Sequence, residues 1–143
     1  LLTRSESKQQ LGAALGAELV AGTPDDVRAF WPGGADLVIE CTGVPATVAM
    51  SPKLTKSGGR IVILGVLPQG LEVPIEPFDL LFREIQMHFS FLNPFTHARA
   101  AEMIANGSID VSSLISRRIT LAEAPDVIAK PAAAGEIRAI VAP

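Results

Sequence analysis

The sequence predicts an α/β fold, a Rossmann-type parallel sheet with helices on both faces. The first indication is a set of short apolar runs without polar alternation, such as Leu-Val-Ile at 37–39 and Ile-Val-Ile-Leu at 61–64. Strands of this kind belong to parallel sheets whose two faces are both covered. The second indication is that a segment of helical length separates each run from the next, as crossover connections between parallel strands require.

Glycine, proline and hydroxyl residues mark the ends of the elements in the first half of the chain. Gly16 stops the first predicted helix, and Thr23 can cap a second helix that opens at Pro24. Gly58 and Gly59 turn the chain into the next strand. The predicted elements are a strand end at 1–3, a helix at 5–15, an apolar run at 17–20, a helix at 24–30, a strand at 36–40, a helix at 45–54 and a strand at 61–64.

A loop at 68–77 leads into the second half, where the same punctuation continues. Gly107 stops a long helix, and Pro125 lies in the first turn of a later one, where proline is tolerated. The predicted elements are a short helix at 78–83, a strand at 86–91, a helix at 94–106, a strand-like run at 115–121, a helix at 122–129 and an apolar end at 137–141.

The domain organisation expected from this order is a partial dinucleotide-binding domain at 1–112 and a C-terminal segment at 113–143. Residues 1–4 resemble a strand that runs directly into a loop, so the sheet is expected to be incomplete and to start from its second strand. The glycine-rich turn that cradles a pyrophosphate on a helix N-terminus would then lie upstream. The C-terminal segment is expected to return towards a catalytic domain.

Composition excludes several classes of function. The 12 Lys and Arg residues are scattered and outnumbered by 15 Asp and Glu, which argues against a nucleic-acid partner. The longest apolar run is too short to cross a bilayer, and no signal peptide is recognised. The single cysteine, Cys41, excludes an internal disulfide and suits a reducing compartment. We therefore expect a cytoplasmic protein without a membrane partner.

Candidate binding residues follow the apolar runs. In an open parallel sheet the ligand lies outside the carboxyl ends of the strands, so the residues immediately after each strand are the ones to consider. Glycines there serve two needs, because they permit tight turns and allow the backbone to approach a flat ring closely. These candidates are Thr3, Arg4, Ser5, Glu40, Cys41, Thr42, Gly43, Gly65, Val66, Leu67, Ser90, Phe91, Leu92 and Asn93.

A series of motifs in a fixed order identifies a family. They are Glu-Cys-Thr-Gly at 40–43, Ser-Gly-Gly-Arg at 57–60 followed by Ile-Val-Ile-Leu-Gly at 61–65, Phe-Arg-Glu-Ile at 82–85 and Gly-Glu-Ile-Arg at 135–138. In this order they resemble the zinc-dependent medium-chain alcohol dehydrogenases, and within them the polyol branch typified by sorbitol dehydrogenase. The resemblance covers essentially the whole chain.

The resemblance implies an oxidoreductase that transfers hydride between NAD(P) and an alcohol or polyol. Zinc would be held only by residues upstream of Leu1, and this chain would supply the cofactor-binding part without any catalytic residue. By itself the chain is expected to be inactive. Two alternatives remain: a zinc-free relative resembling the quinone reductases, or a non-catalytic fragment that binds nucleotide or dimerises.

The cofactor expected is NADP, with NAD as the alternative. Members of the family usually carry an Asp at the end of the second strand, where its carboxylate accepts hydrogen bonds from the adenosine ribose of NAD. Here Thr3 and Arg4 stand in its place, and a guanidinium can donate charge-assisted hydrogen bonds to a 2′-phosphate. Lys8 matches a family lysine that reaches the ribose. If Arg4 is only a solvated loop charge, no preference for NADP follows.

The resemblance also implies roles for the remaining candidates. Cys41, Thr42 and Gly43 would line the adenosine-side ribose. Residues 65–67 would line the nicotinamide side, and residues 90–92 would offer backbone groups to the carboxamide. Arg138 matches a family position that contacts the pyrophosphate.

Neither a zinc site nor a catalytic histidine is expected within the chain. Zinc needs about four ligands, and the chain offers one thiol and two histidines, His88 and His97, without a paired ligand motif. Cys41 is therefore expected to be a small packed residue. Asn93 and His97 are expected to border the substrate pocket. Sorbitol dehydrogenases carry an Arg-Tyr pair at 92–93, so sorbitol itself is not the substrate we expect.

The strand at 86–91 is expected to lie at the edge of the sheet. In the family this strand pairs with its twofold mate, and an apolar edge strand left unpaired would be prone to aggregate. A homodimer or homotetramer is therefore expected. The alternative is an edge covered by the helix that begins at Pro94.

Overall fold

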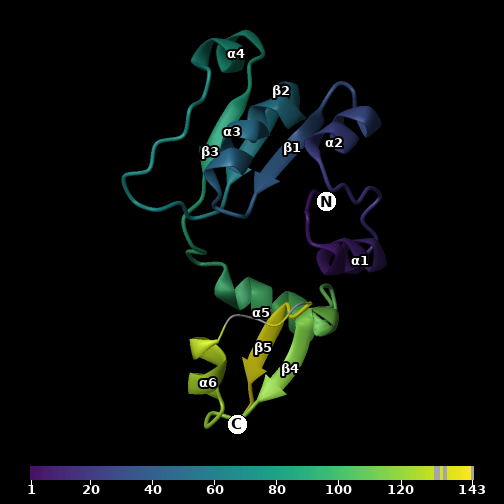
Figure 1. The fold of residues 1–143 in the computed structure, drawn as a ribbon, viewed down its shortest axis with the longest axis vertical. Helices are drawn as coiled ribbons and strands as arrows, with labels where there is room; N and C mark the ends of the chain where they lie inside the picture. Colours follow the sequence, from purple (N-terminus) through teal and green to yellow (C-terminus); the bar gives the residue numbers. More distant parts are fainter. Residues whose placement is uncertain (131–132, 134, 143) are drawn as a thin grey trace.

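The protein folds into two separate parallel sheets with helices around them (Figure 1). The structure is a computed structural model that describes residues 1–130, 133 and 135–142. The sheets have the orders β1-β2-β3 and β4-β5. The elements are α1 (Glu6–Ala14), α2 (Pro24–Phe30), β1 (Ala35–Glu40), α3 (Pro45–Leu54), β2 (Thr55–Ile63), α4 (Pro77–Phe82), β3 (Gln86–Phe89), α5 (His97–Ala105), a 3₁₀ turn (Ser112–Leu114), β4 (Ile115–Ile119), α6 (Ala124–Ala129) and β5 (Arg138–Val141).

The larger core lies between the three-stranded sheet and α3. Parallel pairing puts Val38 opposite Ile61 and Ile61 opposite Met87, so these side chains share one face of the sheet. Ile61 is 0% exposed, and Val48 of α3 packs in the same buried cluster. The opposite face is open in this chain, where Leu37 and Ile39 are 45% and 53% exposed. The parallel α/β class is thus confirmed, with α3 covering one face.

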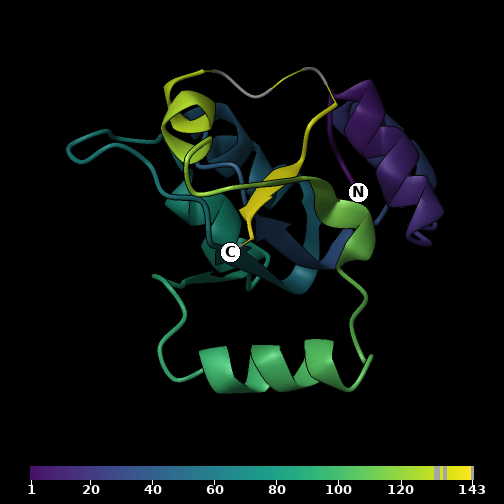
Figure 2. The same cartoon turned by 90° about the horizontal axis from the view of Figure 1, so that it is seen from below.

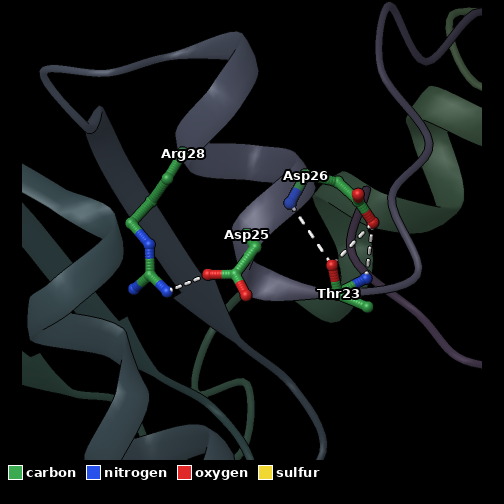
Figure 3. Close-up of polar contacts among 4 residues, drawn as sticks. All are labelled: Thr23, Asp25, Asp26 and Arg28. Carbon is green, nitrogen blue, oxygen red and sulfur yellow. Dashed lines mark hydrogen bonds and ion pairs between the residues drawn. The ribbon is translucent and has the colours of Figure 1, made fainter.

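Local sequence explains why α2 starts where it does (Figure 3). The backbone N–H of Asp26 donates to Oγ1 of Thr23 at 3.3 Å, and the Asp26 carboxylate accepts from the Thr23 N–H at 2.9 Å. This reciprocal capping box satisfies two donors that the helix start leaves without a partner. Hydrogen bonds from the Thr23 hydroxyl and backbone hold the pKa of Asp26 below its usual value. An exposed ion pair between Asp25 and Arg28 adds little.

Arg83 fastens the end of α4 to the end of α3. Its Nη1 donates to the Thr55 carbonyl at 2.9 Å and its Nη2 to the Pro52 carbonyl at 2.5 Å. Its Nε donates to Oδ1 of Asp79 at 2.9 Å. Carbonyls at a helix C-terminus have no partner within the helix, so the guanidinium satisfies them and fixes the start of β3. The motif at 82–85 therefore has a structural purpose.

Most predicted elements are confirmed, and the predicted strand end at 1–3 is the main exception. The strand end at 1–3 and the run at 17–20 appear only as an isolated parallel bridge between Leu2 and Ala21. Two backbone hydrogen bonds make it, from Thr3 to the Ala21 carbonyl at 3.0 Å and from Ala21 to the Leu1 carbonyl at 2.9 Å. The ladder does not extend beyond this bridge.

Other boundaries differ by a few residues. β2 begins at Thr55, earlier than predicted, because Thr55 already pairs with Ala35 before the register shifts and Arg60 pairs with Leu37. The predicted glycine turn is present inside this irregularity, where Gly58 has a φ of 73°. β3 ends at Phe89, and α5 begins only at His97. Left-handed backbone at Leu92 (φ 57°) and Phe95 (φ 61°) explains the delay, because it is incompatible with a helix.

The C-terminal segment forms its own small sheet, with α6 between its two strands in the chain. Ile119 of β4 and Ala124 of α6 are its buried residues. Figure 2 shows α5 standing apart from the other elements, and only Met103 among its residues is half-buried. Within the described part of the chain, no helix has the length and apolar character needed to cross a membrane.

Candidate functional site

Three strand ends meet at one edge of the larger sheet. β1, β2 and β3 are parallel, so their carboxyl ends lie on the same side. The N–H groups of Leu64 and Gly65 donate to the Glu40 carbonyl at 2.8 and 3.0 Å, and the Ser90 N–H donates to the Ile63 carbonyl at 3.0 Å. The turns at 41–43, 64–67 and 90–92 are therefore tied side by side, at the edge where an open parallel sheet binds ligands.

Gly43 and Gly65 allow two of these turns to touch. Gly43 has a φ of 67°, and a Cβ there would overlap the carbonyl of Val66. A Cβ at Gly65 would overlap the backbone of Gly43 and the carboxylate of Glu40. Both positions admit only glycine in this arrangement, because backbone atoms of the neighbouring turn are among those that a Cβ would overlap. Beside them Val66 is 72% exposed, whereas Leu67 packs against the core cluster.

Glu40, at the end of β1, is the buried acid around which the first turn is organised. It is 4% exposed. Its carboxylate accepts from the N–H of Thr42 at 2.8 Å, the N–H of Gly43 at 3.2 Å and the hydroxyl of Thr47 at 2.8 Å, and also from the Thr42 hydroxyl. Burial raises the pKa of Glu40, but the hydrogen bonds from Thr42, Thr47 and Gly43 outweigh it and hold that pKa below its usual value. The group is ionised at neutral pH.

Glu40 is among the candidate residues that follow the apolar runs, but its burial and its contacts with the turn were not predicted. The only signal available was an acid directly after an apolar run, and such an acid is exposed more often than not. The expectation that Cys41 is a packed residue is wrong, because Cys41 is exposed. Side chains of successive strand residues point to opposite faces, and Glu40 occupies the inward direction.

A second group of candidates lies at the start of α1. The hydroxyl of Thr3 accepts from the Ser5 N–H at 3.3 Å, and the Gln9 side chain donates to the Thr3 carbonyl at 2.7 Å. The hydroxyls of Ser5 and Ser7 are hydrogen-bonded to each other at 3.0 Å. Together they give a compact turn that presents hydroxyl groups beside the first backbone N–H groups of the helix.

The cations at this turn have no partner among the described residues. Arg4 and Lys8 are exposed, and neither makes an ion pair within the described part of the chain, whereas Arg83, Arg117 and Lys56 all do. A helix N-terminus also favours negative charge. The turn can therefore hold an anion such as a phosphate through a guanidinium, an ammonium and hydroxyls.

The remaining candidates lie elsewhere. Arg138 is exposed at the start of β5, opposite Ile115 of β4. The C-terminal segment approaches α1 nearby, since a Cβ at Gly135 would be 3.9 Å from the Ser7 Cβ. Arg138 makes no ion pair with any residue in the part of the chain that the structure describes.

Asn93 and His97, the two residues expected at the substrate pocket, lie side by side. The Asn93 side-chain nitrogen lies 2.7 Å from Nε2 of His97, and both residues are exposed. Ser90, Phe91 and Leu92, between them and β3, are exposed as well. Among the described residues no group of three or more His, Cys, Asp or Glu could hold a metal ion.

The sequence and the fold both have relatives among known proteins. Residues 1–108 match a family model described as zinc-binding dehydrogenase. A protein of Rhizobium meliloti (strain 1021), assigned as a D-xylulose reductase, is 34% identical over 95 residues, which are 63% of this chain and 25% of that protein. Sorbitol dehydrogenase of Gallus gallus is 29% identical over 126 residues, which are 85% of this chain and 35% of that protein.

A solved structure extends the match to the whole chain. It is the crystal structure of a protein of Sinorhizobium meliloti 1021, assigned as a zinc-binding dehydrogenase and bound to NADP. It superimposes with a TM-score of 0.93 at 52% identity, covering 100% of this chain and 44% of that one. The chain thus spans less than half the length of these relatives. The family that the motifs indicated is confirmed, since a family model matching most of the residues shows that this chain belongs to the zinc-binding dehydrogenases.

Proposed function

We propose that this chain is the cofactor-binding part of an NADP-preferring dehydrogenase that transfers hydride between the nicotinamide and an alcohol or polyol. Its membership of the zinc-binding dehydrogenases supports the reaction class. The names of two relatives, a D-xylulose reductase and a sorbitol dehydrogenase, support a polyol substrate. A third relative, 52% identical, was crystallised with NADP.

The observation that carries the cofactor preference is the turn into α1. A 2′-phosphate carries about −1.5 to −2 charges at neutral pH, and a carboxylate at the end of the preceding strand would repel it. Here the neutral Thr3 stands beside Arg4, whose guanidinium makes no ion pair within the described residues. Ser5 follows Arg4 directly in the sequence, and Lys8 lies in the first turns of α1. The 2′-phosphate of NADP would accept hydrogen bonds from these donors, whereas NAD, which lacks that phosphate, would leave them in contact with water.

The strand-end turns would hold the rest of the cofactor. Their hydrogen-bonded convergence at one sheet edge supports this assignment. We assign Cys41, Thr42 and Gly43 to the adenosine-side ribose, Gly65, Val66 and Leu67 to the nicotinamide side, Ser90, Phe91 and Leu92 to the carboxamide, Arg138 to the pyrophosphate, and Asn93 and His97 to the border of the substrate pocket.

Zinc, where it is bound in such enzymes, supplies a Lewis acid for the alcohol oxygen. We propose that residues outside 1–143 hold it, because the donor set needed for tetrahedral zinc is not brought together among the described residues. The contribution of this chain is to bind and orient the nicotinamide. Residues 1–112 would form the nucleotide-binding unit and residues 113–143 a segment that packs on the catalytic part, a division supported by the separate β4-β5 sheet.

We further propose that the protein is a homodimer or homotetramer joined through β3. β3 is the last strand of its sheet, so one row of its backbone groups has no strand partner in the described chain. Phe89 is 74% exposed at the end of this strand, and Phe91 is 72% exposed just beyond it. Pairing with a second copy would satisfy the backbone groups and cover the aromatic rings.

The test uses the protein expressed from its complete reading frame. Oxidation of a panel of polyols and simple alcohols is followed through the absorbance of the reduced nicotinamide, with NADP and with NAD. We expect polyol oxidation with NADP and its loss when a chelator removes the metal. Reduction of quinones by NADPH without any alcohol oxidation would favour the zinc-free alternative, and nucleotide binding without turnover would favour a non-catalytic role.

A further inference from the structure

Among the buried residues of the described structure, Glu40 is the one with a charged side chain. Its carboxylate has no cation of the described chain beside it. At 4% exposure it makes no ion pair with any described cation. Its carboxylate is satisfied only by neutral donors, the N–H groups of Thr42 and Gly43 and the hydroxyls of Thr42 and Thr47. A buried charge is costly unless each oxygen is hydrogen-bonded, and here both carboxylate oxygens accept hydrogen bonds from the turn that follows β1 and from α3.

The same residue holds two strand-end turns at once. Its side chain fixes the turn at 41–43, while its backbone carbonyl accepts from Leu64 and Gly65 of the next turn at 2.8 and 3.0 Å. The contact is so close that a Cβ at Gly65 would overlap the Glu40 carboxylate. The carboxylate is therefore bonded to the turn at 41–43 and lies directly against the turn at Gly65.

We propose that Glu40 is a positioning residue for the nicotinamide cofactor, acting through the turns at 41–43 and 65–66. The inference rests on the proposed function, because it assumes that these turns contact the cofactor. An anion is required at this position. One carboxylate oxygen accepts from the Thr42 N–H and the other from the Gly43 N–H, so in either orientation the NH₂ of a glutamine would face one of these donors and leave it without an acceptor.

The test compares Glu40→Gln, Glu40→Asp and the matched control Glu102→Gln in the protein expressed from its complete reading frame. Glu102 is exposed on α5 and its side chain makes no hydrogen bond or ion pair with the described residues. Dissociation constants for NADPH and NADH are measured by nucleotide fluorescence, together with KM and kcat for NADP. The melting temperature without nucleotide is measured for each variant.

We expect E40Q to raise both dissociation constants by the same factor, at least about tenfold, which corresponds to the loss of one or two charge-assisted hydrogen bonds. KM should rise in parallel while kcat at saturating cofactor stays within about threefold, as for a lost binding interaction. E40D, which keeps the anion, should recover part of the affinity, and E102Q should match the unsubstituted protein.

The NADPH to NADH ratio separates the two proposals. That ratio depends on the turn at Thr3 and Arg4. If E40Q weakens binding of both nucleotides and leaves the ratio unchanged, the positioning role of Glu40 is supported. A ratio near one in every variant contradicts only the NADP preference. Unchanged dissociation constants in E40Q, or E40D binding no better than E40Q, would overturn the positioning role.

If E40Q does not fold, a second variant tests the positioning role of Glu40. Thr47→Val removes the hydroxyl that lies 2.8 Å from the carboxylate, and with it the contacts of that hydroxyl to the Thr42 hydroxyl and the Val44 carbonyl, each at 2.7 Å. It should weaken binding of both nucleotides by about threefold or more, consistent with one hydrogen bond. Affinities equal to those of the unsubstituted protein would also overturn the proposal.

Discussion

Replacing Arg4 and Thr3 should reverse the cofactor preference of the complete enzyme. Arg4→Ala removes a guanidinium that makes no ion pair within the described chain, and Thr3→Asp restores the acid that the family usually carries at this strand end. The first change should weaken NADP binding, and the second should both repel the 2′-phosphate and accept hydrogen bonds from the ribose of NAD.

The expected size of the change in cofactor preference follows from the exposure of the turn at Arg4. A hydrogen bond to a charged group contributes about 1.5 kcal/mol at the lower end of its range, which suits an exposed arginine, so R4A should lower kcat/KM for NADP about tenfold. An added carboxylate about 5 Å from a phosphate of about two charges costs roughly 1.7 kcal/mol in a water-like dielectric. The double variant should therefore shift the NADP to NAD ratio by about two orders of magnitude.

The assay measures kcat/KM with each nucleotide for the single and double variants. Arg28→Ala is the matched control, because Arg28 is also exposed and its ion pair with Asp25 lies on a different helix. The control should keep the original ratio. If R4A stays within about twofold of the unsubstituted protein, which is less than one weak hydrogen bond, Arg4 is a solvated loop charge and the reasoning is refuted.

Three predictions concern stability, measured by urea unfolding of the complete protein. Thr23→Ala should cost about 1 kcal/mol by removing the capping box, whereas the control Thr96→Ala, at a cap without a side-chain hydrogen bond to the helix, should cost little. Arg83→Met should cost about 2 kcal/mol because it leaves two helix-end carbonyls without donors, and a loss below about 0.5 kcal/mol would show that water replaces them. Because the pKa of Glu40 is lowered in the folded state, its contribution is present above the ordinary glutamate pKa of about 4.3 and is lost as the pH falls through the folded value. The stability difference between the unsubstituted protein and E40Q should therefore shrink in acid, and a difference that is constant with pH would contradict it.

The fold was largely predictable because its signals are local. α3 spans the predicted residues 45–54, and α2 begins at the predicted Pro24, because a proline in the first turn is visible in sequence. The β-branched run of β1 lies within one residue of its predicted start. These elements are determined by residues next to one another in the chain.

The features that could not be predicted depend on contacts between distant residues. The start of β2 at Thr55 depends on its pairing with Ala35 across the sheet, and the short segments at 1–3 and 17–20 meet only in a single bridge between Leu2 and Ala21. The burial of Glu40 depends on a turn that folds back over it, which composition does not reveal. For the same reason the exposure of Cys41 was not foreseen.

The most direct test of the proposed function is calorimetric titration of the complete protein with NADPH and with NADH. We expect NADPH to bind at least about tenfold more tightly, in line with one charge-assisted hydrogen bond from Arg4 to the 2′-phosphate. Equal dissociation constants, or tighter binding of NADH, would contradict an NADP-preferring dehydrogenase.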